Sequence, residues 1–481
     1  MNVRPSLLEL DYAELEERNL SVKKDRADGV SNEKFKEKFL KYLEEDKAIK
    51  AVTVCFTDME GRFQMLDYDK KYLLGAYENL TFDGSSIRGF TAQKESDLRL
   101  QLDWASFRWL PSDIFGGGKV MIFSNVCDQN GNLYDGDFRA RLSALTEKLK
   151  KDGIIVNVAP EIEGFVFKGV QAEQSYDEKA GFELATMSGY FNCLPQDNLK
   201  LFIDKFAEVK RALGFENEKD HPEVAPAQFE LNYKYTEALE SADQVQLYKL
   251  CARQVAKFMG LTASFLPKPI AGMNGSGMHT NISISKDGVN LFWDEGAENK
   301  VSKVARKFLN GILYYANDIC LTMNSSVNSY RRLDPAFEAP NEIKVSAVDR
   351  GSMIRIPIGN EKSARIEVRT VAPDANPYLS LYSILEAGLA GMNAETSEIA
   401  KHEARVSGKV KTLPGNIYDA ILLFQKSKFM KEIMGDSSHA KYAKLKMKEA
   451  DRSPRALGKR VKSSEVLYHH EVTNQLLWSN F

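Results

Sequence analysis

The sequence predicts a two-domain protein of mixed α and β structure. The chain has 481 residues, more than one hydrophobic core usually organises. A β-rich stretch lies early in the chain, whereas long helical segments alternate with short strand-like runs further on. We therefore expect a charged extension at 1–31, a small domain at 32–130 and a large domain at 135–481.

The elements of the small domain follow from residue spacing. Apolar residues recur at helical intervals over 31–46, and Ser31 or Asn32 can cap a helix that begins there. Two β-rich runs flank residues 58–61 and predict a hairpin, and residues 120–127 predict a further strand.

The large domain is predicted to alternate helices with strands and to end in a mostly helical segment after about residue 412. The expected helices span 139–153, 199–214, 245–260 and 303–320, and the expected strands span 154–158 and 229–235.

Composition excludes several classes of protein. Lys and Arg total 65 against 67 for Asp and Glu, so no overall field would attract nucleic acid or an anionic membrane. No apolar run approaches the ~20 residues that span a bilayer, and acidic residues interrupt the N-terminus too early for a signal peptide. The odd number of cysteines, without a CxxC pair, argues against a disulfide framework or thiolate zinc site and favours the cytoplasm; they are Cys55, Cys127, Cys193, Cys251 and Cys320.

Paired carboxylates follow the strand predicted at 154–158. Glu161 and Glu163 share one face if the chain stays extended, because side chains alternate along a strand. Two acids at this spacing repel each other unless a cation lies between them. The alternative is a solvated strand edge, which the apolar residues on both sides disfavour.

Other acids interrupt apolar runs in the same way. Glu223 and Glu230 lie seven residues apart, and an intervening proline can bend the chain and correct the phase. Arg365, Glu367 and Arg369 share one strand face, which suits either a surface ion pair or a site for metal and phosphate. Five glutamates with one histidine would suit Mg²⁺ or Mn²⁺ and not zinc.

A glycine-containing loop precedes His279. Its sequence NGSG at 274–277 lets the backbone turn sharply and approach a ligand closely. The loop lacks the GK[ST] ending of a P-loop. On spacing alone, His279 reads as a satisfied core histidine.

Taken together, these strings resemble the glutamine synthetase family, in its long-chain class. The resemblance covers about residues 32–400, with the motifs in the family's order. It rests on FDGSSIRGF at 82–90 with Glu95, Ser96 and Asp97, KPIAGMNGSGMHTNIS at 268–283, NSYRRLDPAFEAP at 328–340 and RIEVRTVAPDANPYL at 365–379.

The resemblance implies an α+β fold, with an N-terminal β-grasp domain and a catalytic domain of the glutamine synthetase/guanido kinase-like kind, built on a curved antiparallel sheet with helices. It also implies a dodecamer of two stacked six-membered rings. Active sites would lie between subunits, with residues near Asp83 contributed across the interface.

The resemblance also implies ligands for two divalent metals, Mg²⁺ or Mn²⁺, and contacts for glutamate and ATP. One metal would be held by Glu163, Glu223 and Glu230, and the other by Glu161, His279 and Glu367.

The resemblance implies two further sets of contacts. The substrate contacts would be Asn274, Gly275, Arg332, Arg369, Tyr190 and Asp97. The ATP contacts would be Glu218, Ser283, Arg350, Arg355 and Lys362.

The implied activity is ATP-dependent ligation of ammonia to the γ-carboxylate of glutamate through γ-glutamyl phosphate, giving glutamine, ADP and phosphate. Asp83 would bind ammonium and help to deprotonate it with Tyr190, Glu338 would close over the intermediate, and Arg350 would act on the transferring group. The alternatives are that Asp83 is a turn residue and that Tyr190 only packs.

Departures from common family patterns leave rivals open. Asn281 stands where many members carry His, and HPEV at 221–224 replaces the frequent HHEV. A γ-glutamyl-alkylamine or polyamine ligase would share every ATP and metal residue. An inactive homologue would have lost metal ligands, whereas all six are present here.

Overall fold

The computed structural model describes residues 7–93, 96–172, 181–191, 197–395, 398, 401 and 411–452. Glu95 of the first motif and Cys193 lie outside the described residues. The other four cysteines are buried and free. Among the described helices, none combines the length and apolarity that crossing a bilayer requires.

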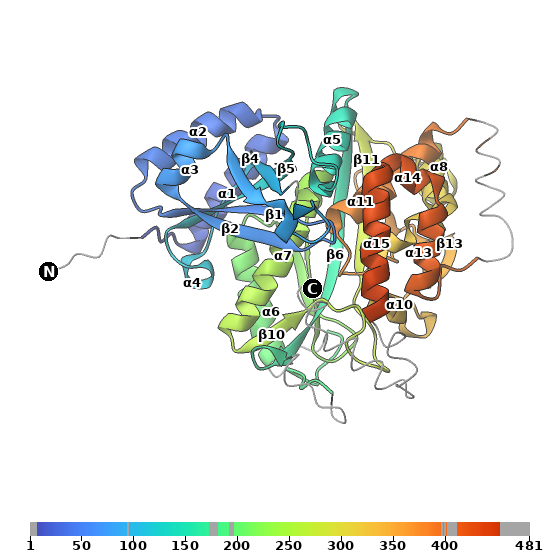
Figure 1. Ribbon diagram of the computed structural model, residues 1–481. Coiled ribbons are helices and arrows are strands. Elements are labelled where there is room, and N and C mark those ends of the chain that lie inside the picture. Colours follow the sequence, from blue (N-terminus) through green and yellow to red (C-terminus); the bar gives the residue numbers. More distant parts are fainter. Residues whose placement is uncertain are drawn as a thin grey trace.

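A five-stranded sheet with the order β2-β1-β5-β4-β3 forms the small domain (Figure 1). Only the β1–β5 pair is parallel, and β1 and β2 form the predicted hairpin. Its strands are β1 Ala51–Thr57, β2 Phe63–Asp69, β3 Leu80–Asp83, β4 Asp97–Trp109 and β5 Lys119–Cys127. The helices beside it are α1 Tyr12–Ala27, α2 Asn32–Glu45, α3 Lys70–Ala76, α4 Ser112–Phe115 and the short 3-10 helix η1 Gly84–Ser86.

Helix α2 begins at the predicted cap. The Ser31 side chain accepts a hydrogen bond from the Lys34 amide, which satisfies one free donor of the first turn. Phe39 lies on the buried face and stacks on Phe107 of β4, with ring centroids 4.1 Å apart. The apolar stripe seen in the sequence is therefore the face that covers the sheet.

Residues of the N-terminal extension form helix α1, which packs against β4 and α6 (Asn198–Ala212). Asn19 is fully buried there, and its side chain bonds the backbone of Trp109 in one domain and of Ala212 in the other. A buried amide with all these partners holds the helix in a defined position. The helix therefore joins the two domains.

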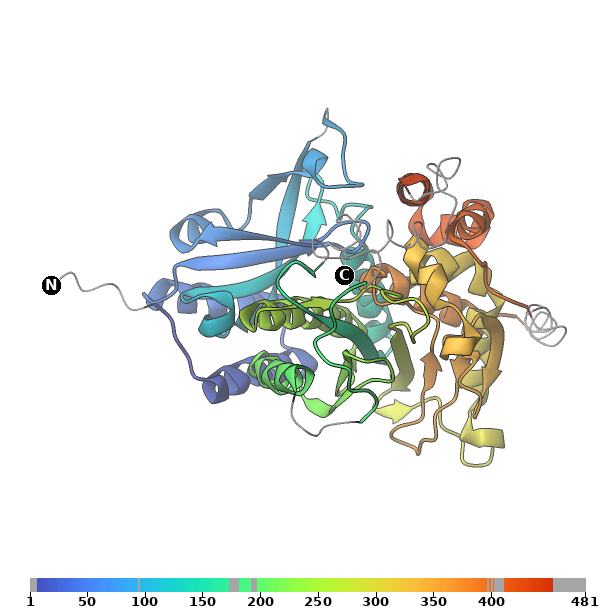
Figure 2. The ribbon, with the colours of Figure 1, turned by 90° about the horizontal axis from the view of Figure 1, so that it is seen from below.

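The large domain is built on a curved sheet of ten strands, in the order β13-β14-β15-β11-β6-β8-β7 with three short strands beside it (Figure 2). Every pair in it is antiparallel except β13–β14. Its strands are β6 Ile154–Lys168, β7 Asn217–Pro222, β8 Gln228–Tyr233, β9 Thr236–Glu237, β10 Leu261–Ser264, β11 Met278–Lys286, β12 Val289–Asn290, β13 Glu342–Ser346, β14 Ser352–Arg355 and β15 Ile366–Val368. The α+β fold class predicted from the sequence is confirmed.

Helices cover this sheet and form the C-terminal end of the described chain (Figure 1). The single helix expected at 303–320 is wrong in one respect: it divides at Tyr315 into α8 and α9. The helices are α5 Phe138–Lys151, α6, α7 Ala238–Phe258, α8 Lys303–Tyr314, α9 Ala316–Met323, α10 Val327–Arg332, α11 Pro377–Asn393, α13 Ile417–Lys426, α14 Lys428–Met434 and α15 Asp436–Arg452, with short 3-10 helices η4 Glu298–Lys300 and η5 Pro335–Phe337.

The β1–β2 turn is anchored to the large domain. Gly61 has φ +98°, and a Cβ there would lie 2.7 Å from Cα of Asn376, so only glycine fits. The Asn376 side chain donates to the carbonyls of Asp58 and Met59 at 3.4 and 3.3 Å. The hairpin predicted from the sequence is thus also a contact between domains.

Candidate active site

Three adjacent strands bring one carboxylate cluster together. The β6–β11 register places Glu161 opposite His279, and β15 on the other side of β11 supplies Glu367. His279 Nδ1 lies 3.6 Å from Glu161 Oε2 and 3.7 Å from Glu367 Oε1. One ligand atom from each residue lies within 4.8 Å of the others. We call these three residues the first cluster.

Hydrogen-bond donors and positive charges offset the negative charge of the first cluster. Burial raises the pKa of Glu161, but hydrogen bonds from His279 and Asn281 outweigh it and lower the pKa to about 2. Glu367 is buried and paired with two cations, Arg369 and Arg355, the latter at 2.8 Å between Nη1 and Oε2. Glu161 is therefore held as a carboxylate, and Glu367 has two cationic partners.

A second cluster lies at β7 and β8. It consists of His221, Glu223 and Glu230, whose ligand atoms also lie within 4.8 Å of one another. His221 Nδ1 is 3.5 Å from Glu223 Oε1, and its Nε2 is 3.8 Å from Glu230 Oε1. His221 was not among the predicted ligands, although its spacing from Glu223 places both on one strand face.

Glu163 borders the second cluster, because the β6–β8 register sets it opposite Glu230. Its Oε2 accepts hydrogen bonds from the Gly277 amide at 2.7 Å and Gln228 Nε2 at 3.4 Å. Burial and then the charge of Glu163 raise the pKa of Glu223 to about 8, and the same causes raise the pKa of Glu230 well above its usual value. Such crowding of acids fits a divalent cation held by oxygen ligands.

The loop that contains NGSG packs against a buried arginine. A Cβ on Gly277 would lie 2.6 Å from Arg332 Nη2 and 2.7 Å from His279 Nε2, and one on Gly275 would meet Pro267 O at 2.4 Å. Arg332 is 2% exposed and donates from Nη2 to the Arg369 carbonyl at 2.9 Å. Burial lowers its pKa to about 10, and within the described chain its Nη1 has no hydrogen-bond partner. A guanidinium edge is thus available to an anion.

A hydrogen bond joins Glu338 to Asn274, the first residue of this loop. Asn274 Nδ2 donates to Glu338 Oε2 at 3.1 Å, and Glu338 holds a left-handed φ of +61° at the end of η5. Such a conformation is uncommon for a residue with a Cβ. Nearby, the Arg350 carbonyl accepts a hydrogen bond from Arg369 Nε at 3.1 Å.

The structure does not bring every predicted site residue together. Tyr190, which is 48% exposed, lies beside the second cluster, with its ring 6.1 Å from that of His221, whereas two predicted aspartates lie apart. Asp83 and Asp97 are register partners on β3 and β4 of the small domain, and Asp83 bonds Ser85 and Ser86 of its own turn, which lowers its pKa. In the described part of the chain, neither aspartate contacts either cluster.

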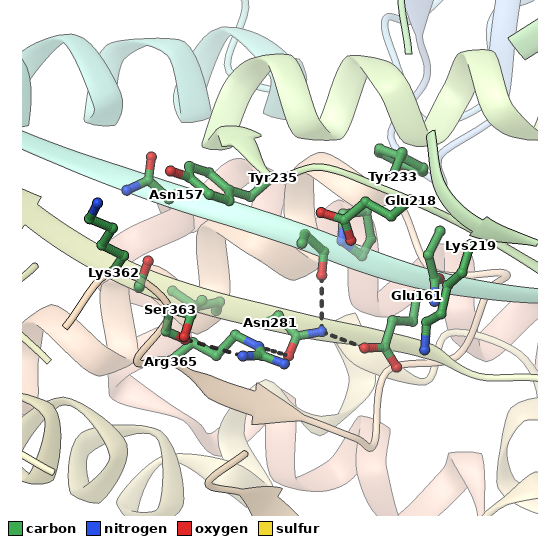
Figure 3. A pocket seen from close by; sticks show the side chains of 15 residues that line it. Asn157, Glu161, Glu218, Lys219, Tyr233, Tyr235, Asn281, Lys362, Ser363 and Arg365 are labelled. Atoms are coloured by element: carbon green, nitrogen blue, oxygen red, sulfur yellow. Dashed lines mark hydrogen bonds between the residues drawn. The ribbon is translucent and has the colours of Figure 1, made fainter. Parts of the chain in front are cut away.

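A pocket of about 300 Å³ opens beside the first cluster (Figure 3). Glu161 lines it, together with three residues predicted to contact ATP, which are Glu218, Ser283 and Lys362. Arg350 and Arg355 are not among the residues that line it, and Arg355 pairs instead with Glu367. Lining residues that were not among the predicted ATP contacts include Asn157, Lys219, Tyr235, Asn281 and Arg365.

A hydrogen-bonded chain runs from this pocket to the first cluster. Arg365 Nε donates to Asn281 Oδ1 at 3.0 Å, and Asn281 Nδ2 donates to Glu161 Oε1 at 2.9 Å. Figure 3 shows both bonds, with Asn281 between the two charged side chains. The two-residue interval between His279 and Asn281 was the signal in the sequence, since it sets both on one face of a strand.

The fold and site define a two-domain protein of mixed α and β structure, whose curved sheet carries two acidic clusters, one of them beside a pocket. Two family models match the chain: the β-grasp domain of glutamine synthetase at residues 48–129 and its catalytic domain at residues 135–462. The chain belongs to the glutamine synthetase family and is a ligase of that family.

Curated relatives agree over most of the chain. A glutamine synthetase of Methanosarcina mazei is 36% identical over 84% of this chain and 92% of its own length. One of Thermus thermophilus is 35% identical over 84% and 94%. Among solved structures, a complex of GmaS (γ-glutamylmethylamide synthetase) with ADP superposes with a TM-score of 0.74 at 25% identity, covering 88% of this chain and 97% of GmaS. GmaS without ligand gives 0.71.

Proposed function

We propose that this protein ligates ammonia to the γ-carboxylate of glutamate with ATP, forming glutamine, ADP and phosphate. The observation that carries the proposal is the position of the first cluster, whose Glu161 also lines the pocket that contains Glu218 and Ser283. A nucleotide in this pocket would have its phosphates next to a carboxylate and histidine set suited to a divalent cation. The relatives named glutamine synthetase support the same substrates.

The donor groups fit two Mg²⁺ or Mn²⁺ ions. Glu161, His279 and Glu367 would hold one ion, and Glu163, Glu223 and Glu230 would hold the other. His221 could serve as a further, neutral ligand of the second ion, because burial lowers its pKa. Bound there, the ions would neutralise charge on the phosphates during transfer.

Glutamate would bind beside the NGSG loop. Arg332 would bind the α-carboxylate through Nη1, which has no hydrogen-bond partner in the described part of the chain, with Asn274 and Gly275 lining the same place. Arg369, already bonded to Glu367, would hold the γ-carboxylate next to the first cluster. The carboxylate that reacts would therefore meet the phosphate that is transferred.

The reaction would proceed in two steps. A γ-carboxylate oxygen attacks the terminal phosphorus of ATP and ADP leaves, giving γ-glutamyl phosphate, with Arg350, Arg355 and Lys362 as proposed cationic contacts. The ammonia nitrogen then attacks the acyl carbon, and phosphate leaves. Glu338 would accept a proton from the adduct and shield the acyl phosphate from water.

Asp83, Asp97 and Tyr190 are proposed to handle the amine. The Ser85 and Ser86 bonds keep Asp83 ionised, as binding of ammonium requires. Because Asp83 lies in the small domain, we propose that it serves the site of a neighbouring subunit in a cytoplasmic dodecamer of two stacked six-membered rings. Analytical ultracentrifugation tests this assembly, and an active monomer would contradict it.

A second candidate is ligation of an alkylamine or polyamine. It is favoured by the likeness to the GmaS structures, which share the fold over most of this chain. The phosphate-forming half of the reaction would be unchanged, and only the attacking amine would differ.

One assay separates the two candidates. Purified protein is given glutamate, ATP and Mg²⁺ with ammonium, methylamine, ethylamine or putrescine, and phosphate release is followed. We expect the highest kcat/KM with ammonium. A higher value with an organic amine would replace the ammonia assignment by the second candidate, and no release with any amine would refute both.

A further inference from the structure

Strand β7 carries an irregularity where it borders the pocket. Asn217 pairs with Tyr233 of β8, and Asp220 pairs with Leu231. Between these two pairs β7 therefore advances by three residues and β8 by two. One extra residue on one strand is a β-bulge, which re-aims the side chains next to it.

The bulge accounts for the direction of two neighbouring side chains on β7. In a regular strand, Glu218 and Lys219 would point to opposite faces of the sheet. Both instead line the pocket. Only one of them, Glu218, was predicted from the sequence as a nucleotide contact, so Lys219 is an additional cation in this pocket.

Lys219 lies at the end of the pocket that borders the first cluster. Figure 3 shows its side chain beside Glu161, and its positive charge contributes to keeping the pKa of Glu161 low. Lys362 is at the opposite end in the same view, next to Asn157. The two lysines therefore lie at opposite ends of the pocket.

The remaining cation of the pocket is already engaged. Arg365 donates to Asn281 Oδ1 and, from Nη1, to the Ser363 carbonyl at 3.1 Å. Lys219 is exposed, and among the described residues it has no hydrogen bond and no ion pair within 4 Å. Its ammonium is thus free to bind an anionic group.

We propose that Lys219 is a phosphate-binding residue, whose ammonium contacts the polyphosphate of the nucleotide beside the first cluster. The inference rests on the proposed function, because it requires a nucleotide in this pocket. A lysine acts there as a flexible point charge and can follow the phosphates between the ATP and ADP states. The alternative is that Lys219 is a solvated surface lysine, which only offsets the negative charge of Glu161.

The test is isothermal titration calorimetry of the full chain with MgADP and with adenosine. For Lys219→Met we expect affinity for MgADP to fall about tenfold, the usual weight of one charged hydrogen bond. Affinity for adenosine should not change, and Lys219→Arg should retain most of the MgADP affinity. The matched control is Lys286→Met, which removes an equally exposed lysine at the far end of β11.

A salt series gives a second readout. Affinity for MgADP should fall less steeply with salt in Lys219→Met than in the wild type, because one screened attraction is lost. MgADP affinity within twofold of wild type in Lys219→Met, or an equal loss for adenosine, would overturn the inference alone. A wild-type protein that binds neither MgADP nor MgATP would overturn the proposed function and the inference together.

Discussion

The Asn281 side chain donates a hydrogen bond to Glu161 at 2.9 Å, from within a buried position on β11. Its other end accepts from Arg365 at 3.0 Å. An amide can do both, whereas a purely donating or accepting group can do only one. Asn281 therefore fixes the direction of a proposed metal ligand and of a pocket arginine at once.

Replacing Asn281 should weaken metal binding. In Asn281→Leu the side chain keeps its size but leaves Glu161 and Arg365 without their shared partner. Loss of such a supporting contact typically costs about 10-fold or more in metal affinity. Titration with Mn²⁺, followed by water proton relaxation without substrates, measures this. Asn157→Leu is the control, since Asn157 lines the same pocket but bonds Ser285. Equal Mn²⁺ affinity in Asn281→Leu and wild type would contradict the role.

Replacing Glu338 should separate binding from turnover. Glu338→Gln keeps a side chain of the same shape for the contact with Asn274 but removes the proposed proton acceptor. We expect turnover to fall at least about 100-fold, as for loss of a general base, with MgADP affinity unchanged. Phosphate release and calorimetry measure the two quantities. Turnover within threefold of wild type would refute the assignment.

A buried ion cluster should hold α15 on the small domain. Glu60 Oε2 lies 2.6 Å from Arg88 Nε, and its Oε1 lies 2.9 Å from Lys446 Nζ of α15. Both Glu60 and Lys446 are fully buried, and breaking such a pair costs about 3–5 kcal/mol. Lys446→Met should therefore lower the melting temperature by several degrees, measured by calorimetry. The exposed Lys444→Met on the same helix should not, and equal melting temperatures for the two variants would contradict the account.

Lys249 should make stability depend on pH. Burial lowers its pKa to about 7, and the positive charge of Arg253 acts in the same direction. The pKa of an unfolded lysine is ~10.4, so the folded chain holds fewer protons than the unfolded chain between these two pH values. The free energy of unfolding should accordingly rise from pH 7 to about 10 through this residue.

The variant Lys249→Met removes that dependence. Its melting temperature should exceed that of wild type at pH 7 by about 3 °C or more, and the gap should narrow toward pH 10. Lys257→Met, at an exposed position of the same helix, is the control and should track wild type. A gap that widens with pH would show that the sign is wrong.

Local features of the fold were predictable from the sequence, because they depend on neighbours along the chain. The cap at Ser31, the β1–β2 hairpin and the pair Glu161 and Glu163 on one strand all follow from spacing within a few residues. The fold class followed from motifs spread over both domains.

Features that depend on tertiary contacts were not predictable. The position of α1 depends on bonds from Asn19 to Trp109 and Ala212, far away in the sequence. The helix expected at 303–320 divides at Tyr315, where the sequence has no glycine or proline to indicate a break.

The site shows the same division. Acids within apolar runs pointed to the carboxylates, and the family motifs pointed to His279. His221 of the second cluster and part of the pocket lining were missed. Lys219 lies next to the bulge in β7, and Asn281 is oriented by Arg365, the residue before β15. Such contacts depend on register, which one sequence does not specify over long separations.

The central claim is that two groups of acids and histidines bind a pair of divalent cations beside a nucleotide. Crystals grown with Mn²⁺ and ADP, measured at the manganese absorption edge, test it most directly. We predict two anomalous peaks per subunit, one among Glu161, His279 and Glu367 and one among His221, Glu223, Glu230 and Glu163. Peaks located elsewhere, or none at these residues with ADP bound, would contradict the account.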